Sequence, residues 1–213
     1  MTTVQKAAVA VTVLCGVIAS APIATAFAAP IIEEWSAVKA PPPPELKEVT
    51  ADPKTTALLL LDFGKRNCGA RQRCLASIPV IEKLASAARA KGVPVVHTMF
   101  GQATPADIID SVAPKEGEPF VVSGANKFLR TDLEKILKDK GVTTVITTGT
   151  AAHGAVLNTA AAAALLGFKV IVPVDVVSAE TAYPEQYTAW HLANAPGGIA
   201  PQVTITKADM IKF

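Results

Sequence analysis

Residues 56–62 read Thr-Ala-Leu-Leu-Leu-Leu-Asp, and this stretch decides the fold class. A continuous apolar run without alternation is typical of a strand buried on both faces, as in a parallel sheet. The run ends in Asp62, whose carboxyl group is expected in apolar surroundings. Because burial disfavours the charged form and raises a carboxyl pKa, Asp62 is a candidate general acid or base. The alternative is an aspartate that caps a turn through backbone hydrogen bonds, and spacing alone leaves both open.

Downstream of this run, apolar strands alternate with helices. Pro79 suits a first helical turn, and Thr131-Asp-Leu-Glu134 reads as a capping box. The expected strands are 56–62, 93–98, 120–122, 144–148, 169–172 and 202–206, and the expected helices are 79–90, 131–140, 154–166 and 184–194. This alternation predicts an α/β fold with a mainly parallel sheet covered by helices on both faces.

Polar residues at the carboxyl ends of such strands are the candidates for a site. Lys127, in the loop after the third strand, could hold a carboxylate or lower a neighbouring pKa; the alternative is a solvated lysine. His153 opens the helix after the fourth strand and could position water or a carboxylate, or it is structural. His97 is expected to pack in the core, and His191 is expected to pack or to contact a partner. No Asp-x-His or His-x-x-x-His pair supports a catalytic metal, and no Gly-x-Gly-x-x-Gly turn follows a strand, so neither a metal nor a cofactor is predicted.

The first 28 residues predict a cleaved export signal, with Lys6, an apolar run and two Ala-x-Ala patterns. A membrane anchor or an ordinary helix is the alternative. Residues 29–50 form an expected extended leader with the proline run 41–44, and residues 51–213 form the globular domain. The mature protein is therefore expected in a periplasm or outside the cell, with no membrane attachment after cleavage.

Two cysteines remain after cleavage, Cys68 and Cys74. In an oxidising compartment they are expected to form a disulfide that stiffens a small loop. A zinc pair and two free buried thiols are the alternatives.

The composition excludes other classes of protein. The chain has 213 residues, half of them hydrophobic, which does not fit a disordered chain. Its 20 basic and 18 acidic residues leave a net charge of +2 with no long basic run, so nucleic-acid binding is not expected.

Several of these stretches together resemble the isochorismatase-like hydrolase family, also called the cysteine hydrolases. Leu58-Leu-Leu-Leu-Asp62-Phe63 is similar to the family's first strand, which ends in its catalytic aspartate. Residues 127–133, 145–155 and 169–175 are similar to the loop before its fourth strand, that strand with its active-site turn, and the strand after it. The resemblance implies a three-layer αβα sandwich, a cis peptide at Thr150-Ala151, and association of copies into a homo-oligomer.

In the amidase branches an aspartate, a lysine and a cysteine act together, and here the pattern departs. The position of the nucleophile is Ala155, and the family lysine aligns near Val122 or Ser123, so Lys127 reaches the site only if its loop folds back. Isochorismatases proper also carry a small residue in place of the cysteine, after an Ala-His pair similar to Ala152-His153.

The resemblance therefore predicts a hydrolase that acts on a small carboxylated molecule, at a vinyl ether or related bond, without a thiol nucleophile. Asp62 would be the general acid or base, Lys127 and Arg130 would bind the carboxylate, and His153 would position water or substrate. The turn residues Thr150, Ala151, Ala152, Gly154 and Ala155 would line the substrate site. The alternative is an inactive family member that binds a small ligand or a protein partner.

Overall fold

The computed structural model describes residues 29–213, so the predicted export signal at 1–28 lies outside the described residues. The chain divides into two compact units, and the boundary in the sequence falls between Pro41 and Pro42. In the described part of the first unit, the short helix α1 (Ile31–Glu34) is exposed throughout. Within residues 29–213, no helix has both the length and the apolar character needed to cross a bilayer.

The second unit is built around a parallel sheet. Its strands are β2 (Thr56–Leu61), β3 (Val95–Met99), β4 (Phe120–Val122), β5 (Thr144–Thr150), β6 (Lys169–Pro173) and β8 (Val203–Thr206), in the spatial order β4-β3-β2-β5-β6-β8. The short strand β7 (Val177–Ser178) pairs with the end of β5, and β1 (Val49–Thr50) pairs with β9 (Ile211–Lys212) in a separate parallel ribbon. The predicted α/β fold with a mainly parallel sheet is confirmed.

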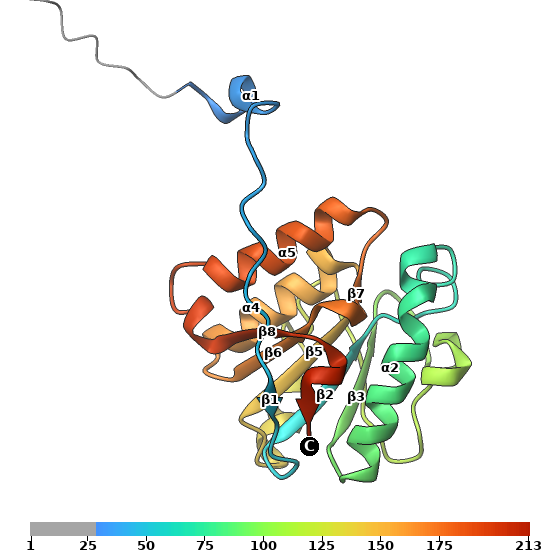
Figure 1. The fold of residues 1–213 in the computed structure, drawn as a ribbon. Coiled ribbons are helices and arrows are strands. Elements are labelled where there is room, and N and C mark those ends of the chain that lie inside the picture. The colour runs from blue at the N-terminus through green and yellow to red at the C-terminus, as the bar shows by residue number, and fades with distance from the viewer. Residues whose placement is uncertain (1–28) are drawn as a thin grey trace, which may run out of the picture. The chain divides into compact units, whose positions relative to one another are not determined.

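The helices cover both faces of this sheet (Figure 1). They are α2 (Gln72–Ala90), α3 (Leu133–Asp139), α4 (Leu157–Leu165) and α5 (Ala182–Asn194). The remaining short turns are Pro105–Asp107, Asp110–Val112, the π-helical turn Ala152–Val156, Val174–Val176, Ala200–Gln202 and Ala208–Met210.

The four leucines of β2 show how the layers form. Leu58 and Leu60 pack with α2, whereas Leu59 and Leu61 pack with α3, α4 and α5. All four are at most 1% exposed, as expected for a strand between two helical layers. The molecule is therefore the three-layer αβα sandwich that the resemblance implies.

All four predicted helix starts differ from the structure, since α4 begins at Leu157 rather than Gly154 and α5 at Ala182 rather than Pro184. Helix α2 begins at Gln72 rather than Pro79, which lies inside it, because Cys74, Ser77 and Ile78 already bury an apolar face before the proline. The capping box at 131–134 does not form: the Thr131 hydroxyl donates to the Lys127 carbonyl oxygen over 2.6 Å, and α3 begins at Leu133 without a side-chain cap. The Thr131 oxygen also accepts a hydrogen bond from the Leu133 N–H over 3.3 Å, so this hydroxyl links the site loop to the start of α3 without forming the predicted box.

The stretch just before residue 51 is bonded to the domain. Lys47 donates its backbone N–H to the Ile205 carbonyl oxygen, and Thr206 donates its hydroxyl to the Lys47 carbonyl oxygen. Residues 49–50 then form β1. The last part of the predicted leader therefore packs with β8 and β9.

Candidate active site

Asp62 stands where β2 ends, at the carboxyl edge of the sheet. Its backbone N–H donates to the Thr98 carbonyl oxygen, and its own carbonyl oxygen accepts a hydrogen bond from the Asn67 amide over 2.7 Å. The φ angle of Asp62 is +60°, a left-handed conformation that aspartate tolerates better than most residues. These contacts turn the chain away from the strand and leave the Asp62 side chain 7% exposed, with the Thr98 hydroxyl donating to Oδ1.

Lys127 meets this carboxyl group. Its side chain is fully buried, and its Nζ lies 2.8 Å from Oδ1 and 2.9 Å from Oδ2 of Asp62. The carbonyl oxygens of Met99 and Ser123 lie 3.3 Å from the same nitrogen. The ammonium group is therefore surrounded by oxygen acceptors, and it is not a solvated lysine.

The loop before α3 does fold back, and Thr159 on α4 holds it. The Lys127 N–H donates to the Thr159 hydroxyl, which itself donates to the Ala125 carbonyl oxygen, each over 3.2 Å. The condition set by the alignment of the family lysine near Val122 or Ser123, that the loop of Lys127 folds back, is therefore met in the structure. Lys127 lies five residues or fewer along the chain from those positions, and tertiary contacts bring it to Asp62.

Burial sets the protonation chemistry of this pair. It raises the pKa of Asp62, while the charge of Lys127 and the hydrogen bonds from Lys127 and Thr98 act in the opposite direction. Burial also lowers the pKa of Lys127, against the effect of Asp62. Because the pKa of Asp62 is raised and that of Lys127 is lowered, Asp62 holds a proton more readily than an exposed aspartate does.

The second part of the site is the turn after β5. The peptide Thr150-Ala151 is cis, as the resemblance implies, and a π-helical turn (Ala152–Val156) leads into α4. Thr150, Ala152 and Ala155 are buried, whereas Ala151 and Gly154 are partly exposed. The register Leu61↔Gly149 places Asp62 and Thr150 next to each other at the ends of neighbouring strands.

Gly149 permits this close approach. A Cβ there would lie 2.0 Å from the Leu61 carbonyl oxygen, and the φ angle is +131°. Only glycine adopts this backbone without strain and without a clash against β2.

Two predicted site residues do not join the pair. His153 and Arg130 are exposed, and neither side chain makes a hydrogen bond or ion pair with another residue of the described range 29–213. Arg130 follows the buried part of its loop with a φ angle of +57°. Sequence position alone placed both near strand ends, but the contacts of the site do not include them.

The histidine expected in the core is there, within an acidic and basic cluster. His97 is fully buried and its Nε2 lies 2.7 Å from Glu118, which also accepts hydrogen bonds from Arg89 and from the Lys115 N–H. Burial alone would raise the pKa of Glu118, but these hydrogen bonds outweigh it and lower the pKa to about 2. Burial lowers the pKa of His97, against the effect of Glu118.

Two polar residues in the loop between β2 and α2 also contact the site and were not predicted from the sequence. Asn67 holds the Asp62 backbone, and Arg71 donates from Nη1 to the Thr150 hydroxyl over 3.3 Å. Both lie within nine positions after Asp62, in a loop that follows the carboxyl end of a strand, which was the available signal. The disulfide Cys68–Cys74 closes this loop as predicted, with its Cα atoms 5.2 Å apart.

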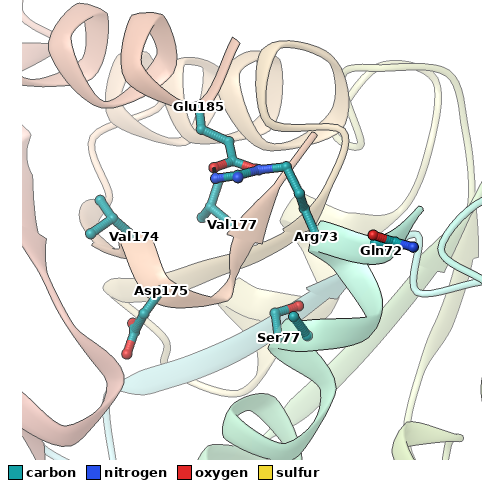
Figure 2. Close-up of a pocket in the computed structure, with 8 residues that line it drawn as sticks. Gln72, Arg73, Ser77, Val174, Asp175, Val177 and Glu185 are labelled. Carbon is teal, nitrogen blue, oxygen red and sulfur yellow. Dashed lines mark hydrogen bonds and ion pairs between the residues drawn. The ribbon is translucent and has the colours of Figure 1, made fainter. Parts of the chain in front are cut away.

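A separate pocket of about 420 Å³ lies beside α2, β7 and α5. Figure 2 shows the Arg73 guanidinium facing the Glu185 carboxylate across it, where the two form a bidentate pair. Its lining includes neither Asp62 nor Lys127, so it is not the immediate surroundings of that pair. Within residues 29–213 there is also no cluster of three or more His, Cys, Asp or Glu suited to a metal ion.

Comparisons with known proteins identify the family. The sequence model of the isochorismatase domain family matches residues 56–204 of this chain. A secreted isochorismatase effector from Verticillium dahliae is 36% identical over 113 residues, which cover 48% of this chain and 60% of the relative. An N-carbamoylsarcosine amidase from an Arthrobacter species is 29% identical over 150 residues, which cover 57% of each chain. The chain thus spans about three-fifths of the length of these relatives.

Solved structures agree on the fold. An isochorismatase family protein from Desulfovibrio vulgaris has a TM-score of 0.66 at 24% identity, covering 73% of this chain and 95% of its own. A cysteine hydrolase from Pseudomonas syringae has a TM-score of 0.68 at 20% identity, covering 78% and 94%. With the domain match over most of the folded unit, the chain belongs to the isochorismatase family of hydrolases.

Proposed function

We propose that this protein hydrolyses a small carboxylated molecule by acid–base catalysis at Asp62, without a cysteine nucleophile. The observation that carries the proposal is the buried Asp62–Lys127 pair at the carboxyl end of β2, beside the turn that contains Ala155. Ala155 has no nucleophilic group, and the two cysteines of the described chain are joined to each other.

The reaction that fits these groups is hydrolysis of an enolpyruvyl ether. Asp62, in its acid form, donates a proton to the terminal methylene carbon and leaves an oxocarbenium ion. Water adds to that ion and returns a proton to Asp62. The hemiketal then collapses to pyruvate and an alcohol, so that one water is consumed and the acid is regenerated.

In this scheme Lys127 is a positioning residue. Its ammonium already has Asp62 and two carbonyl oxygens as neighbours, so its role is to orient the carboxyl group and to stabilise the carboxylate after proton transfer. We therefore place carboxylate binding on another residue. The exposed His153 stays a proposal for water positioning that no contact supports.

A non-catalytic binding protein is the second candidate. The absence of a nucleophile at Ala155 and the near-complete burial of Asp62 favour it. The two candidates differ in one measurable respect, which is whether bound substrate is converted.

The test is turnover of a panel that contains isochorismate, chorismate, N-carbamoylsarcosine and simple amides. Pyruvate release is followed with a lactate dehydrogenase couple, and ammonia release with a glutamate dehydrogenase couple. Asp62→Asn should lower kcat about 100-fold or more, the scale of general acid catalysis. Asp209→Asn, at an exposed aspartate, is the matched control. Turnover that survives Asp62→Asn would refute acid catalysis, and ligand-induced thermal stabilisation without turnover would support the binding protein.

We also propose that the protein is exported. The Verticillium relative is described as secreted, and the Cys68–Cys74 disulfide is typical of an oxidising compartment. N-terminal sequencing of the protein recovered from its native source should find a start near residue 29. A protein that retains Met1 in the cytoplasm would contradict this proposal.

A further inference from the structure

The loop closed by the Cys68–Cys74 disulfide holds Arg71 in a defined position. The Arg71 N–H donates to the Cys68 carbonyl oxygen over 2.9 Å, and its own carbonyl oxygen accepts from the Leu75 N–H over 3.0 Å. Both cysteines are fully buried, so the covalent link is anchored in the core. The backbone that carries this guanidinium is thus fixed on both sides.

The guanidinium reaches the active-site turn. Its Nη1 donates to the hydroxyl of Thr150, a fully buried residue that forms one half of the cis peptide. Asp62 and Thr150 each follow a paired position, Leu61 and Gly149, on neighbouring strands. Adjacent strands lie about 4.8 Å apart, so Arg71 contacts the sheet edge one strand away from the catalytic carboxyl group.

The charge of Arg71 has no partner in the described chain. Of the neighbouring arginines, Arg73 pairs with Glu185 and Arg89 with Glu118, whereas Arg66, in the same loop, is exposed to solvent. Arg71 is partly buried, yet within residues 29–213 it forms no ion pair, and Thr150 is its one side-chain acceptor. The charges of Asp62 and Lys127 pair with each other, so the partly buried Arg71 guanidinium stands at this edge of the sheet without a carboxylate partner among residues 29–213.

This arrangement suits an anion. A guanidinium has five N–H donors, and two of them can bind a carboxylate in parallel. The rival cations fit less well, because Lys127 is already enclosed by oxygen atoms and Arg130 is exposed without a contact in the described range.

We infer that Arg71 binds the carboxylate of the substrate at this site, and that the Cys68–Cys74 disulfide holds it in place to do so. The inference rests on the proposed function for the location of the substrate. It adds a specificity-determining residue in the loop between β2 and α2.

The first experiment measures kinetics on whichever panel compound the wild type converts. Arg71→Gln should raise KM about 10- to 100-fold, the scale of hydrogen bonds to charged groups, and change kcat by less than about threefold. Arg71→Lys should recover part of the loss, because it keeps the charge but not the paired donors. Arg66→Gln is the matched control, an exposed arginine of the same loop, and should leave KM unchanged.

The disulfide is tested in the same assay. The double variant Cys68→Ser/Cys74→Ser should raise KM in the same direction, and Arg71→Gln should add little in that background. Full additivity of the two changes would overturn the role of the disulfide.

A binding experiment separates this inference from the proposed function. Pyruvate, benzoate and N-carbamoylsarcosine are titrated into Asp62→Asn protein by NMR, each beside its uncharged methyl ester. The inference is supported if at least one acid binds more tightly than its ester, and if Arg71→Gln removes this preference while Arg66→Gln keeps it. This holds even if no compound is turned over. If no acid binds more tightly than its ester, or if Arg71→Gln and Arg66→Gln bind alike, the inference is wrong even if turnover is found.

Discussion

Replacing Lys127 with methionine should lower the free energy of unfolding by about 3–5 kcal/mol at pH 7, the cost of breaking a buried ion pair by removing one partner. Methionine keeps most of the length and the apolar stem but removes the ammonium. Asp62 is then left 5% exposed, with the Thr98 hydroxyl as its remaining side-chain donor. A carboxylate in that position has lost its charge partner at 2.8 Å.

The double variant Asp62→Asn/Lys127→Met separates charge pairing from packing. It removes both charges together, so it should be more stable than the sum of the two single changes predicts. The coupling energy should reach about 2 kcal/mol, within the range measured for residues in direct contact. Urea unfolding followed by circular dichroism gives the free energy of unfolding of the wild type, the two single variants and the double variant, which together form the double-mutant cycle.

The pH dependence has a defined sign. In Lys127→Met, burial still raises the pKa of Asp62, and the opposing effect of Lys127 is gone. The folded pKa therefore lies above the unfolded value, so the contribution of Asp62 is fully present below the unfolded pKa and is lost as pH rises through the folded pKa. The deficit of Lys127→Met relative to the double variant should grow between pH 4 and pH 7. A coupling energy under about 0.5 kcal/mol, together with a deficit that does not change with pH, would refute the ion-pair reasoning.

Three further changes test the surrounding structure. Cys68→Ser/Cys74→Ser should cost about 2 kcal/mol, from loop closure over a separation of six residues, and a thiol titration that finds two free thiols in the oxidised wild type would contradict the pairing. The stability that Glu118 contributes is present above its unfolded pKa of 4.5 and should be lost as pH falls toward 2. In Glu118→Gln the free energy of unfolding should therefore depend less on pH between 4.5 and 2. The same pH dependence in the variant and the wild type would contradict this prediction. Gly149→Ala should lose about 3 kcal/mol or fail to fold, whereas Gly124→Ala, with open space around it, should stay within about 1 kcal/mol in thermal unfolding, and equal stabilities would rule out the clash with β2.

Some errors of the sequence analysis share a cause. The start of α2 was predicted at Pro79 because proline, which lacks a backbone N–H, is common in the first turn of a helix. That preference takes no account of the face that residues before Pro79 bury, and α2 begins at Gln72. The capping box failed because the Thr131 hydroxyl donates to the Lys127 carbonyl oxygen, while its oxygen accepts from the N–H of Leu133, the first residue of α3, rather than from that of Glu134. The pattern names one partner for the threonine, whereas the conformation of the folded loop decides which nearby backbone groups its hydroxyl meets.

The short ribbon of β1 and β9 and the strand β7 escaped prediction for a related reason. Each is two residues long, too short to show a period of two. Their pairing partners lie far away in the sequence, so only the folded chain brings the donors and acceptors together.

The sequence by itself determined the layers of this protein. Four leucines in a row can be buried only by helices on both faces, and the alternation of strands and helices makes the sheet parallel, so Asp62 had to lie at its carboxyl edge. The sequence also determined that Ala155 carries no nucleophile and that Cys68 and Cys74 stand within reach of each other.

Only the tertiary structure decided which cations serve the site. Lys127, Arg130 and Arg71 all lie in loops after strand ends, and the sequence treats such residues alike. The hydroxyl groups of Thr131 and Thr159 fold the loop of Lys127 inward, and the Thr150 hydroxyl meets Arg71, while Arg130 stays exposed. The physical reason is that the energy of a cation depends on its burial and on the oxygen atoms around it, and those are set by segments distant in the chain.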